Sequence, residues 1–317
     1  MTARIFIDGA AGTTGLEIRQ RLAGRSGLSL TALADAERKE PAARKRALND
    51  ADVVILCLPD DAAREAVSLI DNPGVRVIDA SSAHRVAPGW VYGFAELEPG
   101  GYDGIRAAKR VSNPGCWATG FLALVRPLVR AGILPADFPV SANGVSGYSG
   151  GGKAMIAEFE NPQAPDYTKA VSRIYGLTLK HKHIPEMTQH AGLAHPPLFQ
   201  PSVGRFYRGM LVELPLALWA LPGTPRTADI QAALQDAYAG RALVRVVPVQ
   251  DGAVPTTLDA EQMAGSDALT IHVFGNEAAG QTRVVATFDN LGKGAGGAAV
   301  QNLNIMLGLP EIEGLQA

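Results

Sequence analysis

The chain has 317 residues, of which 47% are hydrophobic and 19% are charged, as expected for a globular protein of two domains. Its 29 basic and 31 acidic residues give a formal net charge of -2, which argues against nucleic acid as a main partner. Two cysteines are too few for a disulfide framework, and they suit a reducing compartment.

The start of the chain and its apolar stretches indicate a cytoplasmic protein. Residues 3–8 already have a strand pattern, which leaves no room for a secretory signal peptide. The longest apolar stretch, 211–221, contains Glu213 and Pro215 and is too short to cross a membrane. We therefore expect no membrane partner.

Strands and helices alternate in the first part of the chain. The apolar run 51–59 is typical of a parallel strand that is buried on both faces. This alternation predicts an α/β, doubly wound domain of the Rossmann-like type. The expected strands are 3–8, 29–34, 51–59 and 75–79, and the expected helices are 16–23, 37–49 and a third from Asp60 or Asp61 to about 70.

Strand-like runs dominate from residue 140 onward. They predict an α+β domain built on a largely antiparallel sheet. The expected strands are 140–142, 209–218, 242–248, 268–275 and 282–288, with a helix over 227–239 and a glycine-rich loop at 293 that leads into a last helix.

Three glycines lie between the first strand and the first helix. Gly9, Gly12 and Gly15 fit a phosphate-binding turn, in which glycines let the backbone approach a pyrophosphate and the helix N-terminus donates N–H groups. Thr13 and Thr14 add hydroxyls for phosphate oxygens. The spacing differs from G-x-G-x-x-G, so a packing turn without a ligand is the alternative.

The end of the second predicted strand leaves the choice between NAD and NADP open. Asp35 lies where an acid that binds the ribose would favour NAD. Arg38 and Lys39 follow within a turn and could hold the 2′-phosphate of NADP, or they could belong to a solvated charged face.

Cys116 follows a turn made by Pro114 and Gly115 and precedes an apolar helical stretch that starts at Gly120. A thiol at the first turn of a helix feels the positive end of the helix dipole, which favours the thiolate. The unpaired N–H groups of that turn can also bind an oxyanion. The alternative is a small buried hydrophobic residue.

His181, His183 and Glu186 form the second concentration of chemically active groups. If this segment is extended, the two histidines point to the same side. A histidine can exchange a proton near neutral pH, and the carboxylate can orient it. Zinc binding and simple exposure are the alternatives, but no third strong ligand lies nearby, so we expect no metal.

Five stretches together resemble the short form of the N-acetyl-γ-glutamyl-phosphate reductases, in the semialdehyde dehydrogenase superfamily. In chain order they are 9–15, 112–116, 144–153, 181–186 and 289–304. Residues 117–119 read Trp-Ala-Thr where the long form of the family usually has Tyr-Pro-Thr.

The resemblance implies NADPH-dependent reduction of N-acetyl-γ-glutamyl phosphate to N-acetylglutamate semialdehyde, with release of phosphate, in arginine biosynthesis. Cys116 would form a thioester, while His183 (or else His181) exchanges protons and Glu186 orients it. Backbone N–H groups and the Asn113 side chain would stabilise the oxyanion.

The resemblance also implies how the chain is organised. It favours NADP, and therefore Arg38 and Lys39 over Asp35. The last helix, from about residue 295, would return to the first domain and bring Asn302 near the nicotinamide. The domains would then be 1–115 with about 292–317, and 116–291. A mixed sheet in the second would form the interface of a homodimer or homotetramer.

The substrate's phosphate and carboxylate need cationic or N–H-rich partners. The resemblance makes Arg85 a candidate ligand of the phosphate, because related semialdehyde dehydrogenases have a phosphate-binding arginine at a comparable place. Lys153, Arg208 and the loop with Ser146 and Ser149 are further candidates, although each cation could instead form a surface salt bridge.

Two other functions stay open. One is a semialdehyde dehydrogenase for an aminoadipyl or aspartyl phosphate. The other is a sensor or scaffold that binds NADP without turnover.

Overall fold

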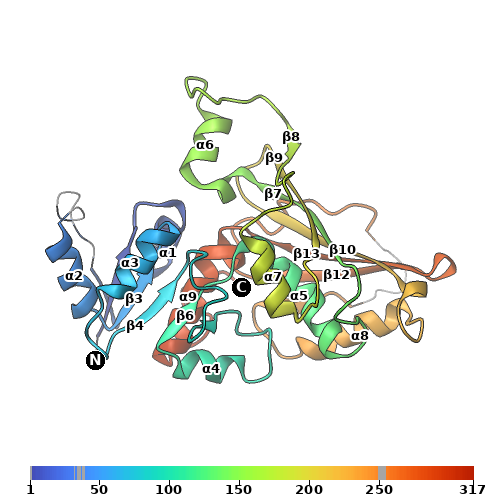
Figure 1. Ribbon diagram of the computed structural model, residues 1–317, viewed down its shortest axis with the longest axis horizontal. Helices are drawn as coiled ribbons and strands as arrows, with labels where there is room; N and C mark the ends of the chain where they lie inside the picture. The colour runs from blue at the N-terminus through green and yellow to red at the C-terminus, as the bar shows by residue number, and fades with distance from the viewer. Residues whose placement is uncertain (1, 32, 34–36, 38–39, 249–254) are drawn as a thin grey trace. The chain divides into compact units, whose positions relative to one another are not determined.

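The computed structural model describes residues 2–31, 33, 37, 40–248 and 255–317 (Figure 1). The chain divides into two compact units. The first consists of Met1–Gly115 with Ala295–Leu315, and the second of Cys116–Gly294 with Gln316–Ala317.

The first unit contains a parallel sheet with the strand order β2-β1-β3-β4-β6-β5. This confirms the predicted Rossmann-like domain. The strands are β1 (Ala3–Asp8), β2 (Leu28–Thr31), β3 (Val53–Leu56), β4 (Arg76–Asp79), β5 (Val91–Tyr92) and β6 (Arg110–Ser112).

Helices cover both faces of this sheet. Along β1, Ile5 and Ile7 pack into one core together with residues of α1, α4 and α9, whereas Phe6 packs into a second core with residues of α2 and α3. Figure 1 shows α9, at the red end of the colour scale, beside β4 of this unit. The helices are α1 (Thr13–Leu22), α2 (Pro41–Asp50), α3 (Asp60–Ser68), α4 (Gly101–Ala107) and α9 (Gly297–Leu307).

Local chemistry makes two of these elements shorter than predicted. All of Val53–Leu56 is buried, as expected for a strand covered on both faces, but the strand stops before Pro59, which precedes α3. Helix α2 begins at Pro41, because proline is favoured at the first helical position.

The second unit contains a mixed sheet with the order β11-β12-β13-β10-β7-β9-β8. Four pairings are antiparallel, and two, β11 with β12 and β7 with β9, are parallel. This confirms the predicted mixed, largely antiparallel sheet. The strands are β7 (Ser141–Gly147), β8 (Ser172–Ile174), β9 (Leu198–Gly204), β10 (Met210–Ala217), β11 (Val244–Val246), β12 (Leu269–Asn276) and β13 (Gln281–Phe288).

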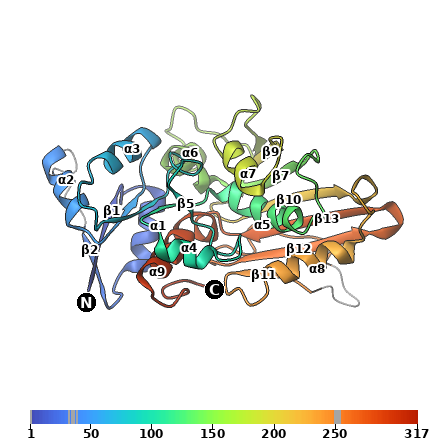
Figure 2. The same ribbon diagram turned by 60° about the horizontal axis from the view of Figure 1, so that its bottom comes forward.

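The helices of this unit are α5 (Cys116–Arg130), α6 (Gly152–Glu160), α7 (His183–Ala191) and α8 (Thr227–Ala237). Helix α5 packs on β10 and β13 and against α7 and α8 (Figure 2). Helix α5 begins at Cys116, before the apolar stretch predicted from Gly120, which confirms that the thiol lies in the first turn of a helix. The condition of an extended histidine segment is not met, because α7 begins at His183. No helix in the described ranges is long and apolar enough to cross a membrane.

Candidate active site

Cys116 is the first residue of α5. Its thiol therefore lies at the positive end of the dipole of a 15-residue helix, next to N–H groups that have no partner within the helix. The backbone of Gly294 approaches it closely, because a Cβ at Gly294 would lie 2.9 Å from the Cβ of Cys116. A larger residue at 294 would displace the cysteine.

Cys116 opens into a cavity of about 230 Å³ within the second unit. His181, His183 and Ser146, three of the predicted site residues, line the same cavity. The structure thus brings the thiol and both histidines together. The remaining lining residues are Trp117, Gly147, Gly150, Gly151, Met155, Tyr175, Lys182 and Val203.

The two histidines lie side by side, with ring centroids 4.9 Å apart. The backbone N–H of His183 donates to Nδ1 of His181 at 3.3 Å, so in the neutral His181 ring the proton is on Nε2. His183 is buried, whereas His181 is half-buried. Glu186 is buried one turn after His183 on α7, which puts the two side chains on the same side of the helix.

The sequence did not single out Tyr175 as part of the site. The indole Nε1 of Trp117 donates to the Tyr175 hydroxyl at 2.8 Å, and Trp117 packs edge-on against Phe199, with ring centroids 5.1 Å apart. Lys182 and Met155 were also missed as lining residues. The only available signal was closeness in sequence, since Trp117 follows Cys116 and Lys182 lies between the two histidines.

The other predicted substrate contacts of this unit do not line the cavity. Ser149 is buried and accepts a hydrogen bond from Asn290 Nδ2 at 2.9 Å, which anchors the loop. Arg208 forms an ion pair at 2.6 Å with Asp289, whose carboxylate is fully buried. Lys153 is exposed near the start of α6.

The glycine turn of the first unit fits a dinucleotide phosphate. Gly9 has φ +85°, and a side chain there would collide with the carbonyl of Cys57. Gly12 is the N-cap of α1, and Thr13 and Thr14 begin the helix, so the N–H groups of the first turn and two hydroxyls lie together. The predicted 2′-phosphate contacts, Arg38 and Lys39, and the alternative Asp35 lie outside the described residues.

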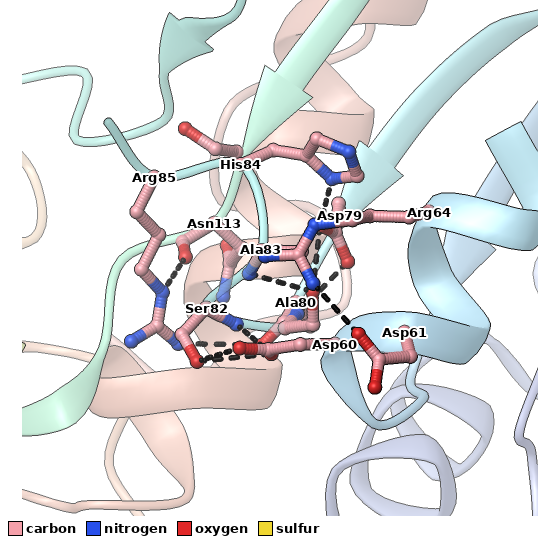
Figure 3. Close-up of polar contacts among 12 residues, drawn as sticks. Asp60, Asp61, Arg64, Asp79, Ala80, Ser82, Ala83, His84, Arg85 and Asn113 are labelled. Carbon is pink, nitrogen blue, oxygen red and sulfur yellow. Dashed lines mark hydrogen bonds and ion pairs between the residues drawn. The ribbon is translucent and has the colours of Figure 1, made fainter. Parts of the chain in front are cut away.

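Arg85 is held in a buried turn after β4 (Figure 3). Its Nε donates to the carbonyl of Asn113 at 3.1 Å. The turn itself is fixed by the fully buried Asp79, which accepts hydrogen bonds from both the N–H and the hydroxyl of Ser81 and lies 2.6 Å from His84 Nδ1. In Figure 3 the His84 and Arg85 side chains leave the turn in different directions.

The Asn113 side chain is also fixed within the first unit. Its Nδ2 donates to the carbonyl of Ala295, and its Oδ1 accepts from Asn302 Nδ2, both at 3.0 Å. Asn302 is fully buried, and its Oδ1 has no hydrogen-bond partner in the described part of the chain. An orphaned acceptor of this kind fits an amide donor such as that of a nicotinamide.

No group of three or more histidine, cysteine, aspartate or glutamate side chains among the described residues could hold a metal ion.

Two family matches cover most of the chain. Residues 4–104 match the family described as semialdehyde dehydrogenase, NAD binding domain, and residues 116–290 match semialdehyde dehydrogenase, dimerisation domain. Among solved structures, an aspartate semialdehyde dehydrogenase from Francisella tularensis aligns with a TM-score of 0.72 at 13% identity, over 96% of this chain and 100% of that one. One from Pseudomonas aeruginosa, described as probable, aligns with a TM-score of 0.71 at 14% identity, over 97% and 99%. At such identities the likeness concerns the fold alone.

Curated relatives are much more similar in sequence. N-acetyl-gamma-glutamyl-phosphate reductases from Brucella ovis and Brucella canis are each 54% identical over 309 residues, which is 97% of this chain and 100% of theirs. The chain is an enzyme of the N-acetyl-gamma-glutamyl-phosphate reductase family, within the semialdehyde dehydrogenases.

Proposed function

We propose that the enzyme reduces N-acetyl-γ-glutamyl phosphate to N-acetylglutamate 5-semialdehyde with NADPH and releases phosphate, as a step of arginine biosynthesis. The observation that carries the proposal is the cavity shared by Cys116, His181 and His183. The substrate assignment is supported by relatives that match over their whole length.

In the proposed reaction, His183 takes the thiol proton of Cys116, and the thiolate adds to the acyl carbon. The tetrahedral oxyanion collapses to a thioester, and the bond to the phosphate oxygen breaks so that phosphate leaves with the electron pair. The N–H groups of Cys116 and Trp117 are the backbone donors for the oxyanion, with Asn113 as a side-chain candidate. Glu186 orients His183.

The cofactor site is proposed in the first unit. Gly9, Gly12 and Gly15, with the hydroxyls of Thr13 and Thr14, would hold the pyrophosphate. Asn302 Oδ1 would accept from the nicotinamide amide. Arg38 and Lys39 are the proposed contacts of the 2′-phosphate. When bound, NADPH supplies the hydride that reduces the thioester.

We also propose that the enzyme is a cytoplasmic homodimer or homotetramer. Support comes from the match of residues 116–290 to a dimerisation domain. Analytical ultracentrifugation measures the oligomer.

The function is tested in the oxidative direction. N-acetylglutamate semialdehyde with NADP+ should give NADPH at a rate that depends on inorganic phosphate. Aspartate semialdehyde should react far more slowly, and NAD+ should replace NADP+ poorly. Equal or faster turnover of aspartate semialdehyde or an aminoadipate semialdehyde would contradict the proposed substrate, and binding of NADP without turnover would indicate a sensor.

Arg85 is the proposed ligand of the substrate phosphate, as a cation fixed in a buried turn. Arg85→Ala should raise the KM for inorganic phosphate by about 10- to 100-fold, because a charge-assisted hydrogen bond contributes roughly 1.5–3 kcal/mol. The KM for the semialdehyde and the Kd for NADPH should stay close to those of the wild type.

Lys153→Ala and Arg208→Ala provide the comparison, since both cations are also proposed as substrate contacts. If either variant raises the phosphate KM more than Arg85→Ala does, that residue is the phosphate ligand instead. Melting temperatures show whether the loss of the pair between Arg208 and Asp289 has simply unfolded the protein.

A further inference from the structure

The Tyr175 hydroxyl already accepts one hydrogen bond, whereas its proton is still available to donate one. Its hydroxyl oxygen accepts the hydrogen bond from Trp117 Nε1 at 2.8 Å. In the part of the chain that the structure describes, no hydrogen bond uses the hydroxyl proton. Tyr175 lines the same cavity as Cys116, so an acceptor for this proton fits in the cavity beside the thiol.

The surroundings keep this hydroxyl neutral. Burial raises the pKa of Tyr175, and the negative charge of Cys116 raises it further. The phenol therefore stays protonated while the thiolate forms, and it remains a hydrogen-bond donor throughout.

Trp117 fixes the direction of the phenol. It is nearly fully buried, and its ring is held edge-on against Phe199. The indole N–H donates to the Tyr175 hydroxyl, so the lone pair of the phenol oxygen that faces Trp117 is already used. A donor preorganised in this way pays little reorganisation cost when charge develops in front of it.

We propose that Tyr175 is a catalytic residue that donates a hydrogen bond to the oxygen of the acyl group while this group is bonded to Cys116, and that Trp117 positions it. The proposal rests on the proposed function, because it requires an acyl group on the cysteine. That oxygen becomes negative when the thiolate adds to the acyl phosphate and again when the thioester is reduced. One donor would then lower both barriers.

Three variants test the role: Tyr175→Phe, Trp117→Phe and the double variant. Tyr175→Phe should lower kcat by about 10²–10³, with little change in KM, because the bond strengthens only as charge develops. Trp117→Phe keeps the phenol of Tyr175 but removes the hydrogen bond that orients it, and it should lower kcat by about tenfold. In the double variant the loss should match that of Tyr175→Phe alone, because the indole acts through the phenol.

Two further measurements follow Cys116 itself and do not require NADPH to react. Mass spectrometry of enzyme quenched after mixing with the acyl phosphate should show slow acylation of Cys116 in Tyr175→Phe. The rate of alkylation by iodoacetamide should stay within about threefold of the wild type, since the thiolate itself is unaffected.

The outcomes separate the two proposals. If Tyr175→Phe is acylated as fast as the wild type with unchanged kcat, or if it changes only KM, the catalytic role is wrong. If losses in the two single variants multiply in the double variant, the positioning role of Trp117 is wrong. If the wild type forms no acyl adduct at Cys116, the proposed function fails, and with it the role of Tyr175.

Discussion

Replacing Cys116 with serine is expected to lower kcat by about 10³–10⁶, with the Kd for NADPH unchanged, because removal of a covalent nucleophile leaves only binding and oxyanion stabilisation. The serine hydroxyl is nearly isosteric but stays protonated at neutral pH. Fluorescence of bound NADPH measures the Kd, and phosphate-dependent oxidation of N-acetylglutamate semialdehyde measures kcat.

Cys57 is the internal control for this prediction. Burial raises the pKa of its thiol to about 12, and the charges of Asp79 and Asp8 contribute further. In the wild type, iodoacetamide should therefore label Cys116 alone and abolish activity in parallel with labelling. In Cys116→Ser, labelling should stop. Near-normal turnover of Cys116→Ser, or rapid labelling of Cys57, would contradict the assignment of the nucleophile.

The sequence was sufficient to predict a Rossmann-like domain in the first unit because its signals are local, although β5 and α4 were not predicted. In an apolar run such as Val53–Leu56, the side chains on both faces are removed from water only if both faces of the strand are covered. The end of the strand was less predictable, since it depends on the turn chemistry at Pro59. For the second unit, the sequence predicted the type of sheet, mixed and largely antiparallel, but it did not predict the strands β8 and β9.

The histidine segment shows where periodicity is insufficient. His-x-His predicts that two side chains share a face only if the backbone is extended. The structure starts α7 at His183 instead, and both rings still reach one cavity because the turn before the helix brings them to 4.9 Å. The two rings are therefore neighbours although the extended backbone on which the prediction depended is absent.

The partners of Tyr175 and Arg208 could not be predicted because they come from distant parts of the chain. Trp117 and Tyr175 are 58 positions apart in the sequence, and only the packing of α5 beside the sheet brings them into contact. For Arg208 the sequence left open a substrate contact or a surface salt bridge, and the structure shows an ion pair with the fully buried carboxylate of Asp289. A buried partner of this kind has no local sequence signal.

His183→Asn is expected to lower kcat by about 10²–10⁴, the usual contribution of a general acid–base group. Asparagine keeps a donor of similar size at the start of α7 but cannot exchange a proton near neutral pH. His181→Asn should cost less, because His181 is more exposed and its Nδ1 already accepts the backbone N–H of His183. The exposed His195→Asn is the matched control and should match the wild type.

Chemical rescue separates proton exchange from structural support. His183→Ala leaves space beside a cavity of about 230 Å³, so added imidazole should enter and restore part of kcat. The same imidazole should not rescue Cys116→Ser, because there the missing group is the nucleophile. If His181→Asn loses more activity than His183→Asn and His181→Ala is the variant that imidazole rescues, the two histidines exchange roles. If neither alanine variant responds and both melt at much lower temperature, the pair supports the fold of the cavity and another group carries the proton.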